Sequence, residues 1–470
     1  MTPDEFRARA HEVIDWIADY MRTVEDRPVL SQVKPGDISA MLPAQPPEHS
    51  EPWDRILGDL DTIVQPGLTH WQSPSFFGYF PANSSGPAIL GDLVSSGLGV
   101  QGMLWSTSPA CTEIETTMLD WLARMIGLPE SMMSHGAGGG VLQGTASEAA
   151  LVSLLAARAQ RDHPDQPTVY CSSQAHSSIM KAAMIAGLGK DAVRLIDVDE
   201  SLRMDVSSLD RQLRNDVESG HSPLFVCATV GTTSSGAIDP VEQIAAVSQQ
   251  HNCWLHVDAA WAGSACVCPE HRDLLNGVEA ADSFNFNPHK WMLTTFDCSA
   301  LWVRNRKPLL DALSIMPEYL RNQASETGAV IDYRDWQIPL GRRFRALKLW
   351  FVIRHYGVEG IRTHIRRGVE LAQRFESLVR DDDRFELAAA RSLGLVCFRL
   401  RGDDSANEEL LAKINASGRA FFTHTRLPHP RNPSASQYVI RAAIGAIKTE
   451  ERHIRSAWEL IQTTAGAIQR

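Results

Sequence analysis

Long apolar runs are missing from this sequence of 470 residues. A helix that crosses a bilayer needs about 20 consecutive apolar residues, and no stretch reaches that length. Residues 1–21 intersperse acidic and basic side chains and lack the apolar segment of a secretory signal peptide. We therefore expect a protein that has no membrane span or export signal and works in the cytoplasm.

Basic side chains are also fewer than acidic ones. Lys and Arg total 45 against 56 Asp and Glu, which gives a formal net charge of −11 at pH 7 and a pI near 5.8. Binding to nucleic acid or to an anionic lipid surface depends on clustered basic side chains, and the sequence contains no basic stripe. The composition argues against nucleic acid or a membrane as the main partner.

Cysteine pairs and complete metal-binding motifs are lacking as well. The eight cysteines are scattered, and only Cys266 and Cys268 lie close together, without the second pair that a zinc site needs. His11-Glu12 begins the H-E-x-x-H pattern of zinc enzymes, but the second histidine is absent. We expect reduced, buried thiols and no metal site.

What the sequence does contain is a long region, residues 85–347, in which helical stretches alternate with short apolar runs. The predicted helices are 113–127, 146–160, 177–188 and 240–250, and the predicted strands are 168–171, 193–196, 224–228 and 254–257. This alternation predicts an α/β domain around a mostly parallel sheet, with ligands beyond the carboxyl ends of the strands.

Two further segments flank this domain. Residues 1–84 contain an amphipathic opening helix, a proline-rich linker and a second predicted helix over residues 53–68. Residues 348–470 predict a smaller α+β domain, with a long helix, strands at 393–400 and 438–444, and a last helix from about residue 450.

One lysine follows a strand-like run near the end of the large domain. Phe284 and Phe286 alternate with polar residues, and Pro288 biases Asn287 away from helical geometry, so Lys290 lies near a strand end. Burial among aromatic side chains would lower the pKa of such a lysine, which could then act as a base or form a Schiff base. Alone, a lysine is far more often a solvated surface residue, so the rest of the chain must support this role.

Polar side chains also follow the other predicted strands. Asp258 comes after strand 254–257, and fits the acid that pairs with a protonated pyridine nitrogen, although a helix cap is the alternative. His176 follows strand 168–171, where its ring could stack on a planar cofactor or be structural. Thr233 lies in the hydroxyl-rich turn after strand 224–228.

A glycine-rich segment, residues 136–144, runs into the predicted helix 146–160. Glycines, hydroxyls and a helix N-terminus together make an anion site. Thr145 stands where a nucleotide P-loop requires lysine, and Val141 breaks the dinucleotide pattern, so a site for one phosphate is the simplest interpretation.

The aromatic cluster at residues 70–81 has two interpretations, namely core packing or the wall of a pocket for a flat ligand. A phosphate cradle, a stacking histidine, an aspartate for a pyridine nitrogen and a Schiff-base lysine are the parts that a pyridoxal phosphate site needs.

Nearly the whole chain resembles the aromatic L-amino acid decarboxylases that use pyridoxal 5'-phosphate, the group II decarboxylase family. The stretches that carry the resemblance include GGGVLQGTASEAALVSLLAAR, WLHVDAAWAGSA, NGVEAADSFNFNPHKWML and DYRDWQIPLGRRFRALKLWF. The resemblance implies a fold-type I homodimer with a mostly parallel seven-stranded sheet, a small C-terminal domain and a helical N-terminal arm on the partner subunit.

By this resemblance, Lys290 is the lysine that holds the cofactor as an internal aldimine, Asp258 pairs with the pyridine nitrogen, and His176 stacks on the ring. The phosphate contacts that it implies are Ala146, Ser147 and Asn287, with Thr233 and His289 nearby. The aromatic wall that it implies consists of Trp71, Tyr79, Phe80 and Pro81. Met103, contributed by the other subunit, and Gly341 would shape the substrate pocket.

The family reaction releases carbon dioxide and an arylalkylamine from tryptophan, 5-hydroxytryptophan, DOPA, phenylalanine or tyrosine. Tyr319, on a loop predicted to be mobile (313–330), matches the acid that protonates Cα, and Gly341 leaves room for a large ring. Related aldehyde synthases replace this tyrosine or the stacked histidine, so an aromatic aldehyde synthase is the alternative. An aminotransferase or a cofactor-free scaffold fits the matching stretches less well.

Overall fold

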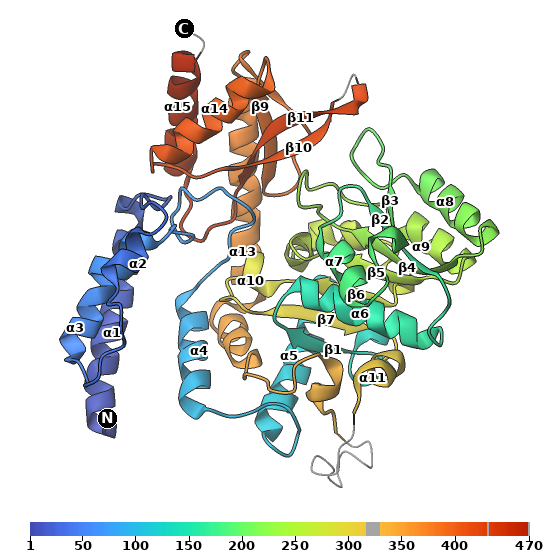
Figure 1. Cartoon of the computed structure of the whole chain (residues 1–470), viewed down its shortest axis with the longest axis horizontal. Helices are drawn as coiled ribbons and strands as arrows, with labels where there is room; N and C mark the ends of the chain where they lie inside the picture. Colours follow the sequence, from blue (N-terminus) through green and yellow to red (C-terminus); the bar gives the residue numbers. More distant parts are fainter. Residues whose placement is uncertain (316–329, 430–431, 469–470) are drawn as a thin grey trace.

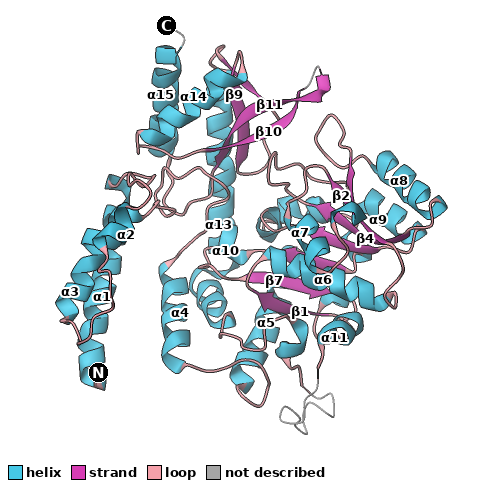
Figure 2. Cartoon of the chain, in the orientation of Figure 1, coloured by secondary structure: helices cyan, strands magenta, loops and turns pink. Residues whose placement is uncertain are grey.

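The computed structural model describes residues 1–315, 330–429 and 432–468. Its centre is a seven-stranded sheet with the strand order β1-β7-β6-β5-β4-β2-β3 (Figures 1 and 2). The strands are β1 Gly139–Gln143, β2 Pro167–Ser172, β3 Val193–Ile196, β4 Ser222–Thr229, β5 Trp254–Asp258, β6 Ser283–Phe286 and β7 Ser299–Val303. Of these seven, β7 alone runs antiparallel to its neighbours. The mostly parallel sheet is therefore confirmed.

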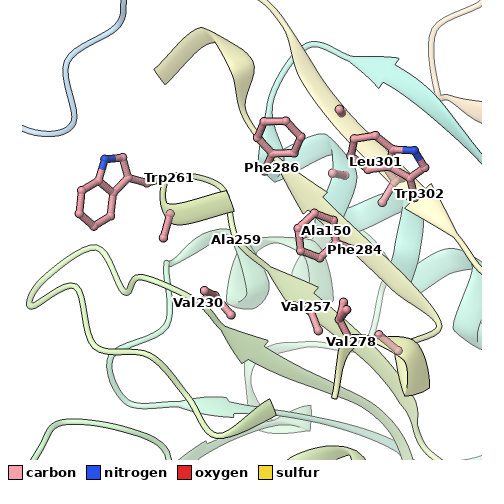
Figure 3. Close-up of a cluster of buried hydrophobic side chains, with 14 of the residues drawn as sticks. Ala150, Val230, Val257, Ala259, Trp261, Val278, Phe284, Phe286, Leu301 and Trp302 are labelled. Carbon is pink, nitrogen blue, oxygen red and sulfur yellow. The ribbon is translucent and has the colours of Figure 1, made fainter. Parts of the chain in front are cut away.

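Helices surround the sheet, either in contact with it or packed on its neighbours, as α4 packs on helix α13 (residues 346–380) and α11 packs on α6. They are α4 Gly86–Leu98, α5 Pro109–Ile126, α6 Ala146–Gln160, α7 Ser178–Ile185, α8 Val206–Glu218, α9 Val241–Gln250, α10 Pro288–Trp291 and α11 Lys307–Leu313. α6 packs across the middle of the sheet, from β4 to β7. Figure 3 shows apolar side chains of β5, β6 and β7 converging with Ala150 of α6. Burial of this interface holds the strand ends, and so the site, in place.

Two strands of this sheet were not predicted from the sequence. β1 is made of residues interpreted above as part of a glycine-rich anion loop, and β7 had no predicted counterpart. The glycines allow close packing, because a Cβ on Gly138 would lie 2.6 Å from the carbonyl oxygen of Val303 and one on Gly140 would lie 2.8 Å from the Trp302 ring. The predicted anion site is thus confined to the turn after β1 and the start of α6.

The N-terminal segment stands to one side of the large domain (Figure 1). It contains α1 Pro3–Thr23, α2 Asp37–Met41 and α3 Trp53–Asp59. α1 begins with a capping box, in which Thr2 and Glu5 satisfy each other's backbone N–H groups, yet none of its residues is buried. The predicted helix 53–68 is regular only to Asp59 and continues as a π-helical turn and a 3₁₀ turn.

The C-terminal segment has its own sheet and its own hydrophobic cluster. β8 Phe385–Leu387, β9 Leu395–Leu400, β10 Thr423–His429 and β11 Asn432–Ala443 form an antiparallel sheet in the order β10-β11-β9-β8. The long helix α13 Ala346–Arg380, broken at Gly357, links it to the large domain, and α14 Asp404–Ala416 and α15 Glu451–Ile468 cover it. This cluster supports a separate C-terminal unit, and the division at 84 and 347 remains our proposal. Within the described residues, no helix is long and apolar enough to cross a membrane.

Candidate active site

Lys290 lies one turn beyond the end of β6. Asn287 caps the short helix α10, Pro288 occupies its first position, and the Lys290 ammonium lies 5.5 Å from the centroid of the Phe80 ring. The side chain is half-buried. Burial lowers the pKa of Lys290, the guanidinium of Arg441 lowers this pKa further, and the carboxylate of Asp258 opposes both effects. The environment therefore favours the neutral, nucleophilic amine.

Asp258 ends the neighbouring strand, β5, and lies opposite Asn285 of β6 in the register of the sheet. Its Oδ1 accepts hydrogen bonds from the Ala260 backbone N–H at 3.0 Å and from Asn285 Nδ2 at 3.3 Å. The residue is buried. Two donors on one carboxylate oxygen fix the orientation of the group.

His176 lies between β2 and α7, and its Nδ1 accepts a hydrogen bond from the Ser178 backbone N–H at 3.2 Å. This bond places the ring proton of the neutral imidazole on Nε2. Much of the ring surface reaches solvent, yet desolvation by surrounding protein lowers the pKa of His176. The charges of Asp258 and Lys290 also act on this pKa, in opposite directions, so the structure brings these three groups together.

The elements that are predicted to bind an anion meet at the same edge of the sheet. Gln143, the last residue of β1, lies opposite Ser299 of β7, and the Ser299 hydroxyl donates to Asn287 Oδ1 at 2.7 Å. Ala146 and Ser147 follow as the first residues of α6, where the backbone N–H groups have no partner within the helix. The Asn287 amide is left with its N–H donors, and these groups together can hold one phosphate.

Two other residues that were predicted to lie near the phosphate, His289 and Thr233, have different surroundings. His289 is buried and its Nδ1 accepts from the Cys298 backbone N–H at 2.9 Å, while burial and the charge of Lys290 lower its pKa to about 3. It is therefore a neutral residue that anchors the turn after Lys290. Thr233 is exposed in the turn after β4, and nothing further in the structure assigns it a contact.

The aromatic cluster divides into a wall at Lys290 and a stack beside it. Phe80 stacks on Trp261 with ring centroids 4.2 Å apart and faces the Lys290 ammonium, and Pro81 is buried next to it in the chain. Trp71 and Tyr79 stack on each other at 5.4 Å and remain 36% and 52% exposed. Phe80 and Pro81 are thus packed in the protein beside Lys290, and a substrate wall made of this cluster stays a prediction.

Arg441 is a site residue that the sequence analysis missed. Its guanidinium lies 5.1 Å from the Phe80 ring centroid and donates to Ser234 O at 3.1 Å and to Thr423 Oγ1 at 3.0 Å. It is buried, on β11 of the C-terminal sheet. The sequence offers no local signal for this residue, because tertiary folding alone brings it to Lys290.

Met103 and Gly341 lie on two segments that contact each other. The Met103 carbonyl accepts from the Arg334 backbone N–H at 3.1 Å, and Gly102 N–H donates to Arg342 O at 3.1 Å. The role of both residues in the substrate pocket stays a prediction.

A buried ion pair anchors this region. Arg342 donates to Glu115 Oε1 at 2.7 Å and to the Leu142 carbonyl of β1 at 2.8 Å, and both charged side chains are 1% exposed. Its guanidinium also lies over the Tyr333 ring, 4.7 Å from the centroid. The segment that carries Gly341 is in this way fixed to α5 and β1.

Two predictions remain to be placed. Tyr319 lies outside the described residues, as does most of the loop 313–330. Across the residues that are described, no group of three or more His, Cys, Asp or Glu side chains could hold a metal ion.

Comparison with known proteins gives consistent matches. The model of the pyridoxal-dependent decarboxylase conserved domain matches residues 35–401. Phenylacetaldehyde synthase from Arabidopsis thaliana is 48% identical over 483 residues, covering 100% of this chain and 97% of that protein. Aromatic-L-amino-acid decarboxylase from Mus musculus is 46% identical over 486 residues, covering 100% and 99%. The crystal structure of Oryza sativa TDC with PLP and tryptamine superposes with a TM-score of 0.96 at 44% identity, covering 100% and 99%.

Proposed function

The chain belongs to the pyridoxal-dependent decarboxylase family, and we propose that it converts an aromatic L-amino acid into the corresponding arylalkylamine and carbon dioxide. It is a carboxy-lyase that depends on pyridoxal phosphate, with a fold of type I. The amine product, the residue roles and the substrate given below are the parts that we propose.

The residues present fit pyridoxal phosphate. Lys290 provides an amine whose pKa is lowered by burial, Asp258 provides a carboxylate whose orientation is fixed, and the exposed ring of His176 is available for stacking. The start of α6, with Ala146 and Ser147, and the Asn287 amide supply N–H donors for the phosphate. Thr233 and His289 would lie near it.

When bound, pyridoxal phosphate supplies an electron sink for the electron pair that remains at Cα after carbon dioxide leaves. The Asp258 carboxylate would pair with the ring nitrogen and favour its protonated form. The His176 ring would pack against the cofactor ring. Phe80 and Trp261, which stack at 4.2 Å, exclude water from the side of Lys290.

Cα must then receive a proton. We assign this step to the Tyr319 hydroxyl, on the resemblance given above, and place Tyr319 in the catalytic set with Lys290, Asp258 and His176. The proton replaces the lost carboxylate on Cα, so the amine route consumes no oxygen. The outcome of the reaction depends on this proton reaching Cα before oxygen does.

The observation that supports this function most directly is the meeting of Lys290, Asp258 and His176 at one sheet edge beside the start of α6. Borohydride treatment of the purified holoenzyme tests it. We expect bleaching of the yellow colour, a pyridoxyl group on the Lys290 peptide by mass spectrometry, and loss of carbon dioxide release from aromatic amino acids. Lys290→Ala should prevent the labelling, whereas Lys190→Ala, a surface control, should not. A protein that stays colourless after reconstitution would contradict the proposal.

A second candidate is an aromatic aldehyde synthase, which the match to phenylacetaldehyde synthase favours. That reaction consumes one molecule of O2 and one molecule of water for each substrate. It releases the aldehyde, carbon dioxide, ammonia and hydrogen peroxide. The presence of both Tyr319 and His176 in the sequence favours the amine route. Release of hydrogen peroxide during turnover therefore distinguishes an aldehyde synthase from a decarboxylase.

For the substrate, we propose an amino acid with a large aromatic ring, of the tryptophan, 5-hydroxytryptophan, DOPA, phenylalanine or tyrosine type. Phe80, Pro81, Trp71 and Tyr79 would form the wall against which the ring packs. Gly341 leaves space at the far side, and Met103 offers a flexible apolar contact.

We further propose that the chain works as a homodimer. The exposed apolar side chains of α4 (Leu90, Leu93, Val94 and Leu98) and the unburied α1 support this, since such surface is usually covered in an assembly. A dimer would also bring Met103 and Gly341 to the partner's site. Light scattering on the purified protein should give twice the chain mass of 51.9 kDa, and a monomer would contradict it.

The cellular location is also a proposal. All eight cysteines are buried and unpaired, which supports a reducing compartment such as the cytoplasm. Fractionation of the native cells tests this.

A further inference from the structure

Four buried polar side chains, one of them that of Asp258, lie on two adjacent strands. His256 and Asp258 of β5 lie opposite Ser283 and Asn285 of β6, in register, so all four side chains project from the same face of the sheet. Their exposed fractions are 0, 5, 0 and 0%. Buried polar groups are costly unless they are hydrogen-bonded, so this set requires an explanation.

The direction of the hydrogen bonds can be assigned at both ends of the set. Trp254 Nε1 donates to Ser283 Oγ at 2.7 Å, and an indole N–H can only donate. The Ser283 hydroxyl hydrogen is then free to be donated to His256 Nδ1, which lies 2.8 Å away. At the other end, Asn285 Nδ2 donates to the Asp258 carboxylate at 3.3 Å.

The middle of the set contains two complementary atoms. With Nδ1 as an acceptor, the neutral His256 ring carries its proton on Nε2. Within the described chain, neither His256 Nε2 nor Asn285 Oδ1 has another hydrogen-bond partner, and both are buried. The two residues are diagonal neighbours on the paired strands, within reach of each other.

We propose that His256 Nε2–H donates to Asn285 Oδ1, which completes a one-way series of donors from Trp254 through Ser283, His256 and Asn285 to the Asp258 carboxylate. His256 and Asn285 are then positioning residues for Asp258. Nothing in the proposed function assigns them a role, and their effect on the cofactor rests on that function.

The series orients the Asp258 carboxylate. Burial lowers the pKa of His256 to about 4, so the ring is neutral near pH 7 and can accept at Nδ1 while it donates from Nε2. Every link points its hydrogen toward the carboxylate, so the series holds the carboxylate oxygens in one direction. A carboxylate held in this way is what pairing with a pyridine nitrogen requires.

Two measurements on the full-length protein test the proposal. In the first, ¹⁵N-histidine NMR without cofactor should show His256 as the neutral Nε2–H form with a hydrogen-bonded, slowly exchanging proton. Asn285→Leu should remove that protection. A His256 signal in the Nδ1–H form, or one unchanged by Asn285→Leu, would overturn the series whatever the enzyme's activity.

The second measurement follows the ring nitrogen of ¹⁵N-labelled pyridoxal phosphate in the holoenzyme at pH 7. His256→Leu should shift this signal toward the unprotonated form and lower kcat about tenfold, with KM changed less than about threefold. His256→Gln, which keeps a donor, should restore most of both. Phe225→Leu, which removes a ring that stacks 5.6 Å from His256, is the packing control and should move neither.

The outcomes separate the two claims. If Phe225→Leu produced the same shift as His256→Leu, or if His256→Leu left the shift and kcat unchanged, the positioning role would be wrong. If the wild-type protein bound no pyridoxal phosphate, the proposed function would fail, while the histidine spectrum would still decide the hydrogen bond.

Discussion

Lys290 holds its ammonium 5.5 Å from the centroid of the Phe80 ring. Arg441 approaches the same ring at 5.1 Å, so the two basic side chains contact one aromatic ring. Burial and the charge of Arg441 both lower the pKa of Lys290. The C-terminal sheet thus contributes directly to the nucleophile of the large domain.

This arrangement predicts the effect of replacing Arg441. Arg441→Met removes a positive charge, so the pKa of Lys290 should rise and less of the amine should be neutral at a given pH. The rate at which the apoprotein binds pyridoxal phosphate covalently should then reach half its maximum at higher pH, with about a tenfold slower reaction at pH 7 per unit of pKa.

Arg441→Lys is the matched control, since it keeps the charge. In this variant the pH at which the binding rate is half its maximum should stay near that of the wild type, although part of the contacts to Ser234 and Thr423 is lost. An unchanged midpoint in a folded Arg441→Met protein would show that Arg441 does not tune Lys290.

If Gly341 lines the substrate pocket, its missing side chain sets the size of the aromatic ring that the enzyme accepts. Gly341→Ser places a hydroxymethyl group where the pocket of a dimer would admit the ring, and the new Cβ would lie 3.4 Å from Gln101 Oε1. The ratio of kcat/KM for tryptophan to that for phenylalanine should fall about tenfold. Gly58→Ser, where a Cβ meets nothing within 4 Å, should leave the ratio as it is. Equal ratios in both variants would remove Gly341 from the substrate pocket.

The Glu115–Arg342 pair predicts a loss of stability. Glu115→Gln or Arg342→Met leaves one buried charge without its partner, which should lower the free energy of unfolding by about 3–5 kcal/mol. The double variant should lose less than the sum. Urea unfolding followed by fluorescence measures this, and Asp4→Asn, which breaks an exposed pair with Arg7, should leave the midpoint unchanged. Additive losses would contradict direct coupling.

The role proposed for Tyr319 leads to a prediction about the ratio of amine to aldehyde. Tyr319→Phe keeps the ring but removes the hydroxyl that we assign as the proton donor to Cα. Amine output should fall at least about tenfold, while aldehyde and peroxide rise. Chromatography of the products together with a peroxide assay measures this. Amine output equal to that of the wild type would remove Tyr319 from the mechanism.

The sequence predicted those features that depend on local pattern. The alternation of Phe284 and Phe286 predicted strand β6. The polar residues after each apolar run predicted that the candidate site lies along one edge of the sheet, because parallel strands present their carboxyl ends together. Helix α6 was predicted over its observed range, 146–160, since it combines a hydroxyl-rich start with a continuous apolar run.

What the sequence could not show depends on packing between distant segments. β1 is rich in glycine, which has little strand preference, and its position is set by close approach to Val303 and Trp302. Arg441 and Tyr79 are 362 positions apart, and no local pattern links them.

The most direct test of the central claim is a product balance for the wild-type holoenzyme. Carbon dioxide, amine, aldehyde and hydrogen peroxide should be quantified together for a panel of aromatic L-amino acids under air. We predict equal amounts of carbon dioxide and amine, with no aldehyde or peroxide above the level without enzyme. Aldehyde and peroxide that match the carbon dioxide released would contradict the account and make the chain an aldehyde synthase.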